Sequence, residues 1–126
     1  MRDPFLMKPV GTVRCTRSEA TDDDWDAEST RIELDTTVFD DEALMGLDSF
    51  SHAEVIFLFD RVADAKIVTG ARHPRGQTDW PKIGIFAQRG KNRPNRLGAT
   101  ICEILSVDGT VLHIKGLDAI DGTPVL

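Results

Sequence analysis

A cluster of cationic side chains marks the part of this sequence where chemistry is most concentrated. Four cations fall within eight positions of the segment Gly84–Gly98 (GIFAQRGKNRPNRLG), namely Arg89, Lys91, Arg93 and Arg96. Pro94 fixes its own φ angle and pushes the residue before it toward an extended backbone, so this basic loop has a defined shape. A shaped basic loop indicates an anionic ligand. The alternative is that these cations keep a long connection soluble and pair with acidic residues elsewhere.

Charge is distributed unevenly along the chain. The formal net charge is −6 and the isoelectric point is near 4.9, which argues against nucleic-acid binding by the chain as a whole, because phosphate contacts need a basic surface. Twelve acidic residues and the single Arg31 occupy positions 19–48, whereas seven lysines and arginines and the single Asp79 occupy positions 72–96. One positive face can therefore meet an anion while the acidic remainder discourages nonspecific adhesion.

The other reactive side chains form no common catalytic or metal-binding pattern. The sequence lacks the phosphate-binding-loop, dinucleotide-binding, nucleophile-elbow and zinc-protease motifs. Cys15 and Cys102 stand alone, with no histidine at ligand spacing, which predicts two reduced thiols and no structural metal. His52 is either a general base or a strand residue that caps by hydrogen bonding. Asp118 and Asp121 flank a tight turn, and they also follow a strand end, where ligand-binding loops gather.

One acidic run contains a single large apolar side chain. Trp25 is surrounded by Asp22, Asp23, Asp24 and Asp26. A run with this charge cannot bury itself, so we expect it to be exposed. Trp25 either covers an edge of the fold or stacks on a ligand, and the two roles are compatible.

Short apolar segments separated by turn residues predict a mainly β fold. His52–Phe59 has β-branched and aromatic residues without a helical period, which favours a central strand. Asp108 and Gly109 predict a hairpin turn. The spacing of apolar residues over Phe39–Leu47 predicts a short helix. The remaining predicted strands are Lys8–Arg14, Arg31–Leu34, Lys66–Thr69, Ile85–Ala87, Ala99–Val107, Thr110–Leu117 and Thr123–Leu126.

These elements and the chain length predict one domain over residues 1–126. We expect a compact, closed or nearly closed antiparallel β-barrel with one short helix. Met1–Val10 has no sustained apolar region, and the longest apolar run, Val55–Phe59, is far too short to cross a bilayer. We therefore expect a soluble cytoplasmic protein without a membrane partner.

Several sequence blocks occur in the order found in a known family. They are GTVR at 11–14, GLDSFSHAEVIFLF at 46–59, RHPR at 72–75, and IGIFAQRGKNRPNRLG at 83–98 running on to GLDAIDGTPV at 116–125. Through these blocks the chain resembles the TrmO family, also called YaeB or TsaA-like, across nearly its whole length. The resemblance implies a TsaA-like β-barrel, a tRNA methyltransferase activity that uses S-adenosylmethionine, and a homodimer with its sites near the subunit contact.

The resemblance places the cofactor against separated parts of the chain. The implied cofactor residues are Asp24, Trp25, Asp26, Asp60, Arg61, Arg89, Ala99, Ala119, Ile120, Asp121 and Gly122. The Arg89 guanidinium suits the carboxylate of the cofactor, which it would hold through a forked pair of hydrogen bonds. Charge clustering predicts contacts with tRNA phosphates for a second set, Arg72, Arg75, Lys91, Arg93 and Arg96.

The implied reaction transfers the sulfonium methyl group to N6 of threonylcarbamoyl-adenosine, a modified adenosine beside the anticodon. Such an in-line displacement depends on holding donor and acceptor collinear in a dry pocket, so it requires no nucleophile from the protein. His52 and Asp60 are candidates for a base that removes the N6 proton. The sequence alone assigns no residue a catalytic role.

The chain departs from the family pattern at four places. The family's Pro-Arg-Gln segment aligns with Asp24–Asp26, its His-containing pair with Asp60 and Arg61, and its PNPIG with Pro94–Gly98, and the DIKPY continuation does not follow TPVL. These departures leave two alternatives open. One is the same fold and cofactor acting on a different substrate, and the other is a noncatalytic cofactor- or RNA-binding module.

Overall fold

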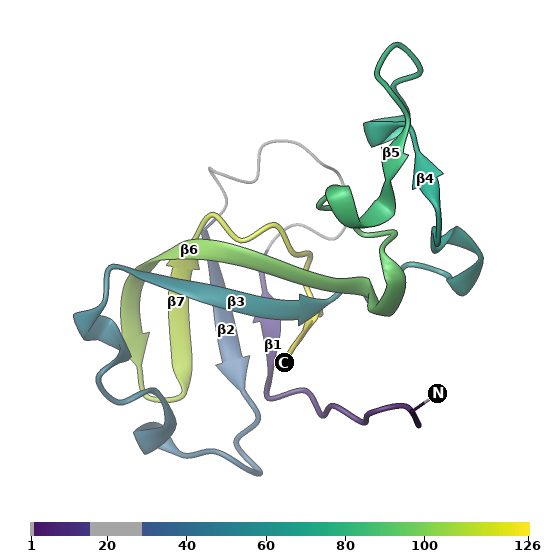
Figure 1. Cartoon of the computed structure of the whole chain (residues 1–126). Helices are drawn as coiled ribbons and strands as arrows, with labels where there is room; N and C mark the ends of the chain where they lie inside the picture. Colours follow the sequence, from purple (N-terminus) through teal and green to yellow (C-terminus); the bar gives the residue numbers. More distant parts are fainter. Residues whose placement is uncertain (1, 16–28) are drawn as a thin grey trace.

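Six strands close into an antiparallel barrel. The computed structural model describes residues 2–15 and 29–126. Within them the strands follow one another around the barrel in the order β1-β2-β7-β6-β3-β8 (Figure 1). Their bounds are Gly11–Arg14 (β1), Ser29–Leu34 (β2), His52–Leu58 (β3), Leu97–Asp108 (β6), Val111–Lys115 (β7) and Pro124–Val125 (β8). The predicted mainly β, closed antiparallel barrel is confirmed.

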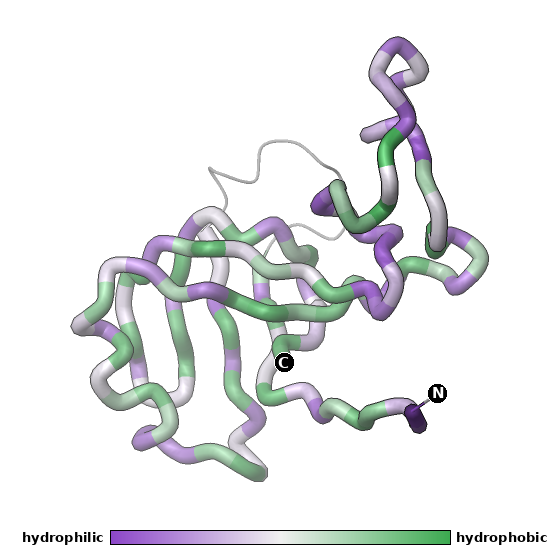
Figure 2. Tube along the Cα trace, in the orientation of Figure 1, coloured by the Kyte–Doolittle hydropathy of each residue, from purple (hydrophilic) through white to green (hydrophobic). Residues whose placement is uncertain are grey.

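Alternating burial along the strands builds the barrel core. Val55 and Phe57 of β3 are buried, and Leu112 and Ile114 of β7 are buried opposite them in the same core. Residues two apart share a face of a strand, so an alternating sequence sends every second side chain inward. Figure 2 shows hydrophobic residues recurring along the barrel strands, whereas hydrophilic residues gather in the segment that leads into β6.

The hairpin between β6 and β7 forms close to its predicted position. Asp108 pairs with Val111, so the two residues of the turn are Gly109 and Thr110, one position later than expected. Gly109 has a φ angle of 60°, in the left-handed region that glycine adopts without steric cost. The two strands pair directly, as the sequence predicts.

An arm of 59–96 leaves the barrel between β3 and β6. The last residue of β3, Leu58, pairs with the first residue of β6, Leu97, so the arm starts and ends at one edge of the barrel. Figure 1 shows the arm projecting away from the barrel. It contains a two-stranded sheet and short 3-10 helices: η4 (Asp64–Lys66), β4 (Ala71–Arg72), η5 (Pro74–Gly76), β5 (Ile83–Gly84), η6 (Ile85–Ala87) and η7 (Pro94–Arg96).

Two predicted strands are wrong, and both lie in the arm. Lys66–Thr69 is not a strand, because Lys66 ends a 3-10 helix and the backbone after it is held by a bond from the Val68 amide to the Asn92 carbonyl (2.8 Å). Ile85–Ala87 forms η6, in which only Ile85 is buried. Phe86 is 70% exposed, so these residues do not enter the core as a strand would.

The helix predicted over Phe39–Leu47 is present as two short 3-10 helices. These are η2 (Asp41–Leu44) and η3 (Leu47–Ser49), separated by Gly46 with a φ angle of 84°. The Asp40 side chain accepts a hydrogen bond from the Glu42 amide and so caps η2. Across the described part of the chain, no helix has the length and apolar character needed to span a bilayer.

A glycine in β6 allows the barrel to close around a phenylalanine. A Cβ atom added at Gly98 would lie 2.4 Å from Cζ of Phe57. The Phe57 ring is fully buried and packs edge-on against the Phe59 ring, with 5.1 Å between ring centroids. Because the ring occupies the space of a side chain at position 98, any residue larger than glycine there would force the ring to shift.

Cys102 lies in the barrel core as a free thiol. Its side chain is almost fully buried. Burial raises the pKa of the Cys102 thiol from 9.0 to about 11, and the negative charge of Asp118 acts in the same direction. The thiol therefore stays protonated in the folded protein at pH values where an unfolded chain would begin to ionise it.

This raised pKa predicts a loss of stability in alkaline solution. The folded protein holds the Cys102 proton more tightly than the unfolded chain, so the contribution of this group is fully present below pH 9 and declines as the pH rises to about 11. Urea unfolding at several pH values measures this decline in the free energy of unfolding. In the Cys102→Ala variant this part of the decline between pH 9 and 11 should be missing, and an identical decline in both proteins would contradict the assignment.

Candidate functional site

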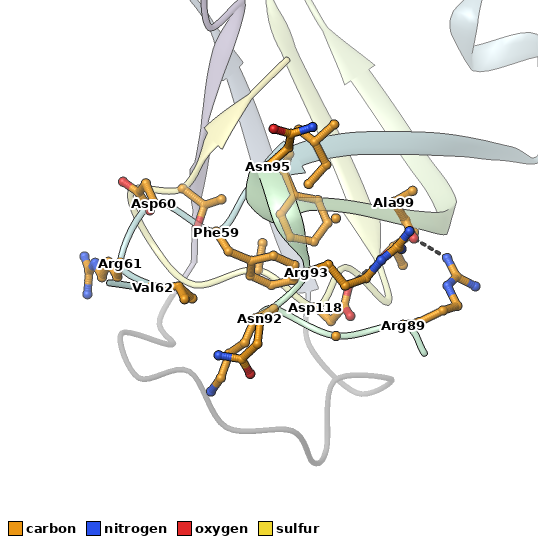
Figure 3. Close-up of a pocket in the computed structure, with 18 of the residues that line it drawn as sticks. Phe59, Asp60, Arg61, Val62, Arg89, Asn92, Arg93, Asn95, Ala99 and Asp118 are labelled. Atoms are coloured by element: carbon orange, nitrogen blue, oxygen red, sulfur yellow. Dashed lines mark hydrogen bonds between the residues drawn. The ribbon is translucent and has the colours of Figure 1, made fainter. Parts of the chain in front are cut away.

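A pocket of about 1300 Å³ opens where the arm joins the barrel. Four stretches of the chain line it, between residues 56 and 66, 86 and 95, 97 and 101, and 118 and 123. Figure 3 shows side chains from these stretches directed toward the same space. The pocket exceeds the volume of about 300–1000 Å³ that is usual for one small ligand. It therefore has room for more than one small ligand.

Asn92 fixes the basic loop against the rest of the arm. Its side-chain amide donates to the Lys66 carbonyl (3.0 Å), and its side-chain oxygen accepts from Nη1 of Arg72 (3.0 Å). Its own carbonyl accepts from the Val68 amide (2.8 Å). Three bonds to the part of the arm between residues 66 and 72 hold this residue, so the loop beside it has a defined position.

Gln88 makes a second set of cross-links within the arm. Its side chain is buried, accepts from Nε of Arg72 (3.1 Å) and donates to the Ile83 carbonyl (3.1 Å). The Arg72 guanidinium thus bonds the side chains of both Gln88 and Asn92. We conclude that Arg72 organises the arm.

The turn into β6 contains two successive residues in the left-handed region. Asn95 has a φ angle of 68° and Arg96 a φ angle of 55°. Such angles are uncommon outside glycine and store strain unless neighbouring contacts hold them. Those contacts are present, because the Arg96 carbonyl accepts from the Phe59 amide (2.8 Å) and its Nη1 donates to the Val62 carbonyl (2.7 Å). Nη1 also lies 3.4 Å from the Asp64 carboxylate.

Two guanidinium groups of the basic loop reach the pocket. Arg89 donates to the carbonyl of Ala99, the contact drawn as a dashed line in Figure 3. Arg93 lies over the Phe86 ring, 5.9 Å from its centroid, and its Nε is buried. Lys91 also lines the pocket. The side chains of this loop therefore bring positive charge to the pocket.

Two carboxylates also line the pocket. Asp60 follows β3, and Asp118 lies in the segment between β7 and β8, where it accepts a hydrogen bond from the Thr100 hydroxyl. Arg61 also lines the pocket and donates to the Asp121 carbonyl (3.3 Å). The pocket thus offers both charges to a ligand that carries both.

The structure brings most of the predicted cofactor residues together. Lining the pocket are Asp60, Arg61, Arg89, Ala99, Ala119 and Ile120. Asp121 and Gly122 follow Ile120 in sequence but do not line the pocket. They belong to a tight turn, in which the Asp121 side chain accepts a hydrogen bond from the Cys15 amide (3.2 Å) and Gly122 has a φ angle of 86°. Asp24, Trp25 and Asp26 lie outside the described residues.

The residues predicted to contact tRNA phosphates divide into two groups. Lys91 and Arg93 line the pocket. Arg72 and Arg96 do not, and their guanidinium groups bond the arm itself. The side chain of Arg75 lies outside the part that the structure describes.

The two candidate bases are separated in the structure. Asp60 lines the pocket. His52 begins β3 at the end away from the arm, is exposed, and contacts the Ser51 hydroxyl through Nδ1 (2.8 Å). Of these two residues, only Asp60 is in a position to meet a bound ligand.

Sequence reasoning missed several residues of the site. Asp118, Phe59 and Asn92 line the pocket but were not predicted as site residues. The sequence signal for Asp118 was its position after a predicted strand, where ligand-binding loops gather. The same position is equally typical of a residue in an ordinary turn. Among residues 2–15 and 29–126, no group of three His, Cys, Asp or Glu side chains is placed to hold a metal ion.

A family model described as the tRNA-methyltransferase O N-terminal domain matches residues 21–126. The chain belongs to the TrmO family. This confirms the resemblance based on the sequence blocks. A solved structure of TrmO from Pseudomonas aeruginosa superposes with a TM-score of 0.75 at 26% identity, covering 98% of this chain and 54% of that one.

Relatives within the TrmO family differ in length and in name. A mouse tRNA (adenine(37)-N6)-methyltransferase is 36% identical over 86 residues, which are 68% of this chain and 20% of that protein. A probable S-adenosyl-L-methionine-binding protein of Methanothermobacter thermautotrophicus is 35% identical over 124 residues, covering 95% of this chain and 85% of that protein. The chain spans about a fifth of the mouse relative and about half of the solved structure.

Proposed function

We propose that this TrmO-family chain binds S-adenosylmethionine in the pocket at the base of the arm and transfers its methyl group to N6 of an adenosine in tRNA. One observation carries the proposal. Six residues that the family resemblance assigns to the cofactor, from four separated parts of the chain, line a single pocket. A pocket that collects them in this way is suited to one ligand with several distinct groups.

The chemical groups of the pocket fit this cofactor. Arg89 is suited to its carboxylate, and the carboxylate of Asp118 is suited to its ammonium charge. Phe59 and Ile120 supply apolar surface for the adenine ring. When bound, S-adenosylmethionine supplies an activated methyl group on sulfur.

The protein residues then act mainly by position. The apolar walls exclude water, and the fixed basic loop holds the reactants in place, so no nucleophile from the chain is needed. Asp60 is the carboxylate that we assign to the N6 proton of the acceptor, since it lines the pocket and His52 does not.

The charge of the pocket supports an anionic acceptor. Its lining includes five cations, Arg61, Lys66, Arg89, Lys91 and Arg93, against Asp60 and Asp118. A cofactor with one carboxylate does not need this excess, whereas a nucleic acid does. This charge is compatible with threonylcarbamoyl-adenosine in tRNA, the acceptor that the family resemblance implies together with a homodimer. We also propose a cytoplasmic location.

A second candidate is cofactor binding without methyl transfer. The Methanothermobacter relative, which the chain matches over 85% of its length, is named for binding S-adenosylmethionine. The methyltransferase relative from mouse is matched over only 20% of its length. A binding module would retain the pocket and its charges but transfer no methyl group.

Labelled S-adenosylmethionine tests the two candidates together. We expect calorimetry to detect cofactor binding, and incubation with bulk tRNA to place the label in threonylcarbamoyl-adenosine, as located by mass spectrometry of the nucleosides. Binding without transfer would favour the second candidate. Absence of cofactor binding by the intact protein would exclude both.

A further inference from the structure

Trp80 presents its indole ring to solvent at the far end of the arm. It lies in the connection between β4 and β5, which Figure 1 shows at the tip of the arm. Trp80 is 50% exposed, and among residues 2–15 and 29–126 no ring contact or hydrogen bond involves its indole. An indole has a large apolar face, so leaving half of this residue in water is costly unless a ligand covers it.

The backbone of Trp80 is fixed on both sides. Its amide donates to the Gln77 carbonyl (3.1 Å), and its carbonyl accepts from Nδ1 of His73 (2.9 Å). Pro81 follows it and disfavours helical backbone angles at Trp80. The ring is therefore carried on a shaped turn. A residue ordered before its ligand arrives loses little freedom on binding.

The surroundings of Trp80 favour RNA over a protein partner. Its neighbours at positions 77–79 are exposed and polar, and a single ring is too small to form the apolar core of a protein interface. Lys82 is exposed two positions further on, and residues 59–96 carry a formal charge of +6. Aromatic rings among cations suit single-stranded nucleic acid, because the cations meet phosphates while the rings stack on bases.

A second exposed aromatic residue connects the tip of the arm with the pocket. Phe86 is 70% exposed and lines the pocket, and β5 lies between it and Trp80 in the chain. An adenosine beside the anticodon belongs to a loop of unpaired bases, which can turn outward and stack on aromatic side chains. A loop that inserts one base into the pocket therefore has further bases available for the same arm.

We infer that Trp80 stacks on a second unpaired base of the anticodon loop while the acceptor adenosine occupies the pocket. Every base has a flat face, so this contact adds affinity for a single-stranded loop without reading its sequence. Lys82 then meets a phosphate beside the stacked base. This inference rests on the proposed function, because it takes tRNA as the acceptor.

Binding of model RNA tests the inference without methyl transfer. The probes are an RNA hairpin with an unpaired loop and a blunt duplex of the same stem, each titrated by fluorescence anisotropy without S-adenosylmethionine. Trp80→Ala should weaken hairpin binding by about 5- to 100-fold and leave duplex binding unchanged. Trp80→Phe keeps a ring and should retain most of the affinity. Trp80→Leu keeps only apolar surface and should resemble the alanine variant.

An exposed ring outside the arm provides the matched control. Phe5 is 82% exposed and precedes β1, so Phe5→Ala should bind the hairpin as the wild type does. Equal hairpin affinities of wild type and Trp80→Ala would overturn the inference. Equal weakening of hairpin and duplex would overturn it in favour of a backbone contact, and wild-type affinity in Trp80→Leu would overturn stacking in favour of simple apolar contact.

Salt dependence and oligomeric state separate the remaining roles. A stacked ring releases no counterions, so Trp80→Ala should keep the wild-type slope of log affinity against log salt, whereas Lys82→Ala should lower that slope by about 1. A lower slope in Trp80→Ala would overturn stacking. Sedimentation in which Trp80→Ala loses a dimer, with hairpin affinity unchanged, would assign the ring to a second copy of the chain and overturn the inference.

Failure of this inference differs from failure of the proposed function. A wild-type protein that methylates tRNA, with equal kcat and KM in Trp80→Ala, would overturn the role of Trp80 alone. Hairpin binding that depends on Trp80, but without methyl transfer to tRNA, would support Trp80 and reject the enzymatic proposal. Thermal unfolding of the Trp80 variants confirms that they are folded.

Discussion

Arg89→Ala should weaken the binding of S-adenosylmethionine by about 10- to 100-fold, because it removes a charge-assisted fork to the cofactor carboxylate worth about 1.5–3 kcal/mol. Arg89 lines the pocket, and its exposed side chain contacts only the Ala99 carbonyl among the hydrogen-bond partners in the described chain. The fold should therefore tolerate the change. Isothermal titration calorimetry measures the affinity.

A second arginine provides the matched control. Arg31 is exposed on β2, outside the pocket, and pairs with Glu33 at 3.1 Å. Arg31→Ala removes the same charge from the protein, so it should leave the cofactor affinity unchanged. Equal affinities of wild type and Arg89→Ala would show that the carboxylate is held elsewhere.

Gly98→Ala should destabilise the barrel by about 1–3 kcal/mol, which is the usual cost of adding a methyl group to a packed core. The new Cβ atom would lie 2.4 Å from the Phe57 ring, which is fully buried and packs on Phe59. The ring must shift, and it also lines the pocket, so cofactor affinity should fall with stability. Thermal unfolding should show a lower Tm, by about 4 °C for each kcal/mol.

Gly84 offers a control within the arm that leads to β6. A Cβ atom added there has no other atom within 4 Å, and its φ of −59° suits any residue. Gly84→Ala should therefore change the free energy of unfolding by no more than about 0.5 kcal/mol. Equal unfolding temperatures of the two alanine variants would contradict the role of ring packing at Gly98.

Local sequence was sufficient to predict the elements that build the barrel. His52–Leu58 has the alternation and the β-branched content of a strand whose inward side chains meet a core. The turn at Gly109 was predictable because an aspartate followed by glycine between two apolar segments is typical of a tight hairpin. In both cases the neighbours that determine the structure are also neighbours in sequence.

The arm could not be predicted in this way, because distant contacts determine its backbone. The Val68 amide bonds to Asn92, and the Ile85 amide bonds to the Gly70 carbonyl at 2.8 Å. Apolar residues in Lys66–Thr69 and Ile85–Ala87 therefore resemble strands in sequence but adopt other conformations. No local pattern reports partners that are 15 or more positions away.

The same limit applies to the site. Charge density located the basic loop and with it Arg89, Lys91 and Arg93, which line the pocket. It did not reveal that the guanidinium groups of Arg72 and Arg96 are used within the arm, since their acceptors lie 16 or more positions away in sequence. Which cation faces a ligand and which supports a loop is a property of the fold.

The projection of the arm from the barrel has a consequence for how the tRNA of the proposed function would approach. Residues 59–96 contain nine lysines and arginines against three aspartates, a formal charge of +6, whereas the other residues that the structure describes carry −7. Separated charges of this size give the molecule a large electric dipole. A polyanion is attracted to the arm and repelled by the barrel, so encounters are oriented before any contact forms, and the association rate should fall steeply as ionic strength rises.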